Sequence, residues 1–80
     1  MDGYTFEATV LGIKVAFRIS AATIEKWRHG IAPEGDMRRV KDIARRLCKP
    51  HLRTHGANPG ELWMVRFTAR AVECRKLQQP

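Results

Sequence analysis

Hydrophobic and polar residues alternate over two short stretches near the start of the chain. Every second residue is apolar in both of them: Tyr4, Phe6, Ala8 and Val10 in the first, and Ile13, Val15, Phe17 and Ile19 in the second. A period of two is typical of a strand with one buried face. Gly12 lies between the two stretches and can adopt the positive φ of a tight turn. The pattern therefore predicts an antiparallel hairpin over residues 4–19.

The apolar pattern becomes helical after Ser20. The Ser20 side chain can cap a short helix, which we predict over residues 21–29. A second helix is predicted over residues 36–49, with Asp36 as its N-cap. Pro50 should end it, because proline has no backbone N–H to donate. The apolar residues of this second helix fall on one face: Met37, Val40, Ile43, Ala44 and Leu47.

A third strand is predicted over residues 61–68, where apolar residues occupy both faces, as is typical of a central strand. Residues 69–80 favour neither an extension of that strand nor a short terminal helix. The order strand-strand-helix-helix-strand predicts a single α+β domain over residues 1–80. Its two layers would be a three-stranded antiparallel sheet and two helices that cover one face of it.

Several of these features together resemble a small proteobacterial domain family of unknown function. The resemblance rests on the hairpin with its Gly12 turn, on Ile19-Ser20 before the first helix, on Ile43-Ala44 in the second, and on the closing strand. It covers about residues 4–68, implies the same order of elements, and implies no activity. Members often carry acidic residues on the second helix, whereas this helix is basic, so no shared partner is implied.

The charge of the chain changes the picture of the second helix. The formal net charge is +7, from 15 Lys and Arg against 8 Asp and Glu. The excess is concentrated on that helix and its exit: Arg38, Arg39, Lys41, Arg45, Arg46, Lys49 and Arg53. Clustered cations of this kind are typical of a surface that binds an anionic macromolecule. A solvated surface that only keeps the protein soluble is the alternative.

Composition argues against several other classes of protein. No apolar run approaches the roughly 18 residues of a membrane-spanning helix, and the first residues have no signal-peptide pattern. Two cysteines are too few for a disulfide scaffold. We therefore expect a cytoplasmic protein that does not engage a membrane. No serine or cysteine has an identifiable base, and the glycines form no phosphate loop, so we predict no enzyme and no cofactor.

The histidines and cysteines provide half of a zinc-binding pattern. Cys48, His51 and His55 have a suitable spacing, and Cys74 is a candidate fourth ligand. No Cys-x₂-Cys pair completes the pattern, however, so we predict no metal site.

A helix-turn-helix is one alternative fold of the middle of the chain. Residues 23–30 resemble a recognition helix, and residues 43–47 resemble the helix that follows it in phage repressors. That motif needs another helix just before the recognition helix. Residues 15–19 occupy this place, and they are β-branched and aromatic, which disfavours the motif.

Two functions fit the basic helix. The first is a small binding module that contacts a nucleic-acid backbone or a nucleoprotein. The second is an accessory inhibitor of phage or mobile-element type, similar to anti-CRISPR proteins, that docks on a host protein or nucleoprotein and blocks its nucleic-acid binding. Either would be a monomer or a weak homodimer, and the sequence does not identify the partner.

Overall fold

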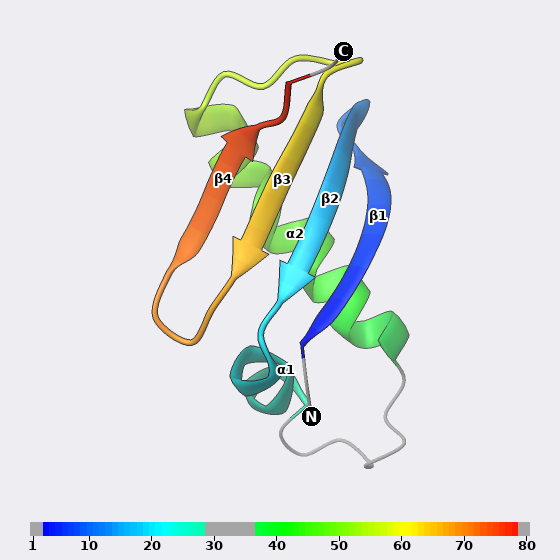
Figure 1. The fold of residues 1–80 in the computed structure, drawn as a ribbon. Coiled ribbons are helices and arrows are strands. Elements are labelled where there is room, and N and C mark those ends of the chain that lie inside the picture. Colours follow the sequence, from blue (N-terminus) through cyan, green and yellow to red (C-terminus); the bar gives the residue numbers. More distant parts are fainter. Residues whose placement is uncertain (1–2, 29–36, 79–80) are drawn as a thin grey trace.

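The computed structural model describes residues 3–28 and 37–78. The elements follow in the order β1 (Tyr4–Val10), β2 (Ile13–Ile19), α1 (Ala21–Trp27), α2 (Met37–Thr54), β3 (Leu62–Phe67) and β4 (Val72–Lys76). One four-stranded sheet in the order β1-β2-β3-β4 forms the first layer. Both helices lie on the same side of it, and α2 runs diagonally across the strands (Figure 1). The predicted α+β class is confirmed.

The predicted N-terminal hairpin is present, and its register runs from Tyr4 opposite Ile19 to Val10 opposite Ile13. Its turn consists of Leu11 at φ 55° and Gly12 at φ 76°. Two successive positive φ values match the right-handed twist of the flanking strands. Gly12 also meets the loop before β3, since its carbonyl accepts a hydrogen bond from the Gly60 N–H at 3.0 Å.

The strand pairing differs from the prediction of three antiparallel strands. β2 and β3 are parallel, with Lys14 opposite Leu62 and Ile19 opposite Phe67. The reason is the connection between them. The segment that contains both helices is long enough to return the chain to the end of the sheet where β2 begins, and only a long crossover permits a parallel pair.

The undecided C-terminal segment contains the fourth strand, β4, which pairs antiparallel with β3. The turn between them is stabilised by Thr68. Its backbone N–H donates to the Ala71 carbonyl at 2.9 Å, and its Oγ1 accepts from the Ala71 N–H at 3.0 Å. The sheet is therefore mixed and has one strand more than predicted.

Ser20 caps α1 as predicted, because its Oγ accepts from the Thr23 N–H at 3.2 Å. The helix ends at Trp27, with Arg28 as its C-cap. The predicted last residue, His29, lies outside the described residues, as does Asp36, the predicted N-cap of α2. Trp27 packs edge-on against Phe67 of β3, with ring centroids 5.0 Å apart.

Helix α2 is longer than predicted, because it continues through Pro50 to Thr54. Its stop signal is Gly56, which has φ 70° and lies just beyond the helix. The Ala57 N–H donates to the Leu52 carbonyl at 2.9 Å, and the Gly56 N–H donates to the Arg53 carbonyl at 3.0 Å. This pair of bonds is a Schellman cap, which closes a helix at a left-handed glycine. The extra turn buries Leu52, which outweighs the cost of an interior proline.

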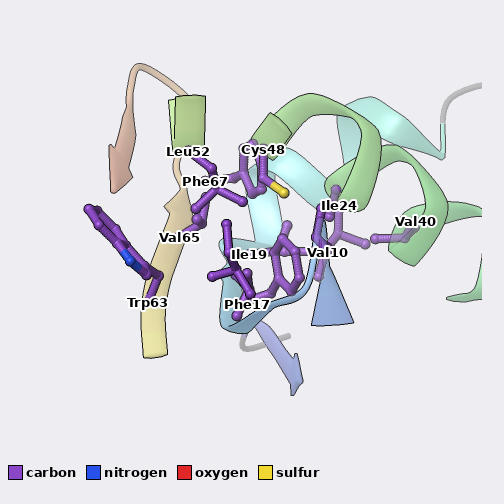
Figure 2. Packing of buried hydrophobic residues seen from close by; sticks show 13 residues of the cluster. Val10, Phe17, Ile19, Ile24, Val40, Cys48, Leu52, Trp63, Val65 and Phe67 are labelled. Atoms are coloured by element: carbon purple, nitrogen blue, oxygen red, sulfur yellow. The ribbon is translucent and has the colours of Figure 1, made fainter. Parts of the chain in front are cut away.

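The core lies between α2, α1 and the inner face of the sheet (Figure 2). Helix α2 contributes four residues that are at most 1% exposed: Val40, Ala44, Cys48 and Leu52. Opposite them lie Phe17 of β2 and Val65 of β3, both at most 1% exposed. The prediction of which residues form the buried face of this helix was therefore partly wrong. Met37 and Ile43 are only half-buried, and Leu47 is 40% exposed.

Glu61 joins the start of β3 to the end of β4. Its carboxylate accepts from Lys76 Nζ at 2.7 Å, from the Asn58 N–H at 2.8 Å and from Trp63 Nε1 at 3.1 Å. These bonds stabilise the charged form. The Lys76 bond contributes most, and together they lower the pKa of Glu61 from 4.5 to about 2. The Glu61–Lys76 pair thus fixes the C-terminal end of β4 against the rest of the sheet.

Candidate binding surface on helix α2

All seven cations predicted as a site belong to α2, where Asp42 is the single acid. The helix does not present them as one group. With 100° between successive residues, they divide into an outer row, a flank, and one residue turned toward the sheet. These three positions differ in what the charges contact.

The outer row consists of Arg39, Arg46 and Arg53, which we call the arginine ridge. These residues are seven apart, so they lie nearly in line on the helix surface opposite the buried stripe. All three are exposed. From the rise of 1.5 Å per residue, the ridge is about 21 Å long. It is the most accessible line of positive charge on the helix.

The flank carries Arg38, Arg45 and Lys49. Arg45 Nη1 donates to Asp42 Oδ1 at 2.8 Å, one helical turn away, and the two side chains are 43% and 64% exposed. Such an exposed pair contributes little to stability. It does neutralise part of the positive charge on this flank, so the flank attracts anions less than the ridge does.

Lys41 is turned toward the sheet. Its Nζ lies 5.8 Å from the centroid of the Tyr4 ring and 5.7 Å from that of Phe6, both on β1. These distances are typical of cation–π contacts. The sequence placed Lys41 among the binding cations, whereas the structure gives it a packing contact with β1. The sequence did contain a signal for this contact, because the alternation of Tyr4 and Phe6 with polar residues directs both rings toward the helices.

The opposite face of the sheet carries a second group of cations that the sequence did not single out. Exposed residues of alternating strand positions lie there: Glu7, Lys14, Arg18, Arg66, Glu73 and Arg75. Arg66 and Glu73 form an ion pair at 3.7 Å. Because acids are interspersed with the cations, this face has a weaker positive charge than α2.

The structure also tests two alternatives considered from the sequence, a helix-turn-helix and a zinc-binding cluster. Residues 13–19 form β2, so the helix that a helix-turn-helix needs before α1 is a strand instead. No cluster of three metal-ligating side chains occurs within residues 3–28 and 37–78. In the same part of the chain, no helix is long and apolar enough to cross a membrane.

Cys48 is a packing residue in this structure. Burial raises the pKa of its thiol to about 11, and the nearby Cys74 adds to the effect. Its Sγ donates to the Arg45 carbonyl at 3.1 Å. A thiol with this pKa stays protonated at neutral pH and is a poor nucleophile.

No protein-family model, curated protein or solved structure matches this chain. The function proposed below therefore rests on the geometry and charge of the described residues.

Proposed function

We propose that the protein is a small non-catalytic binding module that contacts a nucleic-acid backbone through the arginine ridge. The observation that carries this proposal is the placement of Arg39, Arg46 and Arg53. They form an exposed line on the face of α2 that contributes nothing to the core. A cationic row without a packing role is best explained by an anionic partner.

Phosphates suit this row better than a carboxylate-rich pocket would. Each guanidinium is a planar fork that donates two parallel hydrogen bonds to phosphate oxygens. A straight row of such forks can follow a regularly charged polymer. Contacts of this kind fix position and carry little sequence information. We therefore propose binding with low sequence specificity and steep salt dependence.

The test compares two triple variants that remove the same charge from opposite faces of the protein. The first replaces Arg39, Arg46 and Arg53 with Gln. The matched control replaces Lys14, Arg18 and Arg66 with Gln on the open face of the sheet. Fluorescence anisotropy with a labelled duplex and a labelled single strand, over a series of salt concentrations, gives the affinity and its salt slope.

We expect the ridge variant to bind at least tenfold more weakly than the parent. Its slope of log affinity against log salt should be smaller by about 2 to 3 for duplex, because three phosphate contacts are lost. The control variant should change both quantities much less. Equal losses in the two variants would mean that net charge alone drives binding. A parent that binds neither probe at low salt would overturn the proposal.

A second candidate function is docking on an acidic protein or nucleoprotein, as an inhibitor would do. Leu47 favours it, since this large apolar side chain is 40% exposed on the same helix as the arginine ridge. Protein interfaces combine an apolar centre with a polar rim, and arginine is enriched in them. Leu47→Ser separates the two functions. It should leave oligonucleotide affinity unchanged. It should abolish retention of a host protein from nuclease-treated lysate if docking is the function.

A further inference from the structure

We infer that two copies of this chain pair through strand β4 to form a symmetric dimer with one continuous sheet. Among the described residues, β4 has a neighbouring strand on one side only (Figure 1). Its other edge presents unpaired backbone groups, which are a template for another strand. Three features of β4 select a second copy of itself as that strand: its backbone alternation, its charges and its exposed apolar residue.

The backbone alternation determines which residues of β4 can pair outward. The Thr68 N–H donates to the Ala71 carbonyl at 2.9 Å, and the Leu77 N–H donates to the Leu62 carbonyl at 2.8 Å. In an antiparallel pair, every second residue directs its N–H and C=O to the same neighbour. The backbone groups of Glu73 and Arg75 therefore bond to β3, while the backbone groups of residues 72, 74 and 76 point to the open edge.

The charges of β4 distinguish between the symmetric registers that these groups allow. A register centred on residue 73 places Glu73 opposite its own copy, and one centred on residue 75 does the same for Arg75. Both arrangements bring like charges together, which is destabilising. The register centred on Cys74 instead places each Glu73 opposite Arg75 of the second copy. In this register the backbone groups of all three residues that point outward, 72, 74 and 76, also find a partner. The register with matched charges is therefore also the one with the most backbone hydrogen bonds.

The other edge of the sheet lacks this complementarity. If β1 paired with its own copy over its full length, the register would be centred on Glu7, an exposed acid. The two carboxylates would then lie opposite each other. Only the β4 edge of the described sheet is therefore matched to itself in charge.

The side of β4 that faces the helices also favours the pairing. Val72 lies on this side, opposite Phe67 of β3, and is 36% exposed. In the proposed register it faces Lys76 of the second copy, whose alkyl chain can cover it. Lys76 remains held by Glu61 of its own chain at 2.7 Å, so this position is ordered before the copies meet.

The symmetry of the dimer has a consequence for binding, which rests on the function proposed above. The twofold axis through the paired strands is perpendicular to the sheet, so both α2 helices lie on the same face. Two arginine ridges would then point in one direction and bind one polymer together. Linked sites of this kind bind more tightly than one site alone.

The first test measures association directly. A five-residue edge buries little surface, so we expect a dissociation constant in the micromolar range or weaker. Sedimentation equilibrium over a wide concentration range should show a monomer–dimer equilibrium. In a Cys48→Ala background, a short bis-maleimide should cross-link Cys74 to Cys74. A matched control with Cys48→Ala, Cys74→Ala and Glu7→Cys should remain uncross-linked. Monomer at every concentration, or equal cross-linking at both edges, would overturn the inference.

The second test uses charge exchange. Glu73→Arg alone and Arg75→Glu alone should each weaken association at least tenfold, because each places like charges opposite each other. An equimolar mixture of the two variants should form a heterodimer in which every facing pair has opposite signs. The double variant Glu73→Arg/Arg75→Glu should dimerise like the parent. A mixture that stays monomeric would refute the register. None of these measurements contains nucleic acid, so failure here leaves the binding function standing, and failure of oligonucleotide binding leaves the dimer standing.

Discussion

The two faces of α2 follow different periods, and this difference explains how one helix can pack into the core and still carry a continuous row of charge. Its buried residues recur every four positions, from Val40 to Leu52, and each is at most 1% exposed. The arginine ridge recurs every seven positions and is exposed. A row with a period of seven runs almost along the helix axis, whereas a row with a period of four is inclined to it.

The inclined buried row accounts for the diagonal course of α2 across the sheet (Figure 1). A helix that packs along such a row crosses the strands at an angle, so the residues on its two flanks leave the core at different points. Leu47 is one residue from Cys48 and still 40% exposed for this reason. The buried face is thus determined by packing, while the outer face is free to carry charge.

The largest effect is expected from Leu52→Ala on the buried face. Leu52 is 1% exposed and packs in the last turn of α2. Its truncation should lower the free energy of unfolding by about 2–5 kcal/mol, because it leaves a cavity in a small core. Leu47→Ala removes the same atoms from an exposed site and should cost less than about 1 kcal/mol. Urea denaturation of both variants measures the difference. Equal losses would mean that Leu47 belongs to the core after all.

A smaller effect, with the opposite sign, is expected from Pro50→Ala. Pro50 lies inside α2, where it cannot donate to the Arg46 carbonyl and its ring crowds that carbonyl. Alanine should restore the bond. An interior proline costs about 3 kcal/mol relative to alanine, and the stiffer unfolded chain of the parent offsets about 1 kcal/mol of this.

We therefore expect Pro50→Ala to raise the free energy of unfolding by about 1–2 kcal/mol. Pro59→Ala, in the loop beside Gly12, is the control and should not stabilise the protein. If α2 ended at Lys49, as the sequence alone indicated, residue 50 would lie outside the helix. The substitution would then bring no such gain in urea denaturation.

The hairpin and the helix cap at Ser20 could be predicted because their signals are local. Alternation, a glycine turn and a capping hydroxyl all act within a few residues. The end of α2 could not be predicted in this way, since Pro50 is a local stop signal that burial of Leu52 overrides. The relevant information was the spacing of Cys48 and Leu52 together with Gly56, which lies six residues beyond the proline.

The parallel pairing of β2 with β3 depends on where the crossover returns the chain, and no single segment encodes it. β4 was missed for a related reason. Four of its five residues are exposed, so it shows no buried face that could give an alternating pattern. The candidate site on α2 was proposed from charge alone, and all seven of its cations lie on this helix. Its division into ridge, flank and the inward-turned Lys41 required the orientation of the helix, which packing determines.

The smallest effect on stability is expected from removing the arginine ridge itself. Neighbouring ridge residues are about 10 Å apart along the helix, which equals the screening length at about 0.1 M salt. Replacing Arg39, Arg46 and Arg53 with Gln should therefore change the free energy of unfolding by less than about 0.5 kcal/mol at that salt. At lower salt the variant should be slightly more stable than the parent, because mutual repulsion is relieved.

The single substitution Arg45→Gln is the control. It also removes a positive charge from α2, but it breaks the ion pair with Asp42, so we expect it to bring no gain in stability at low salt. Urea denaturation at low and high salt measures both. A loss above about 1 kcal/mol in the ridge variant would mean that these side chains pack against the fold, and the separation of the two faces of α2 would fail.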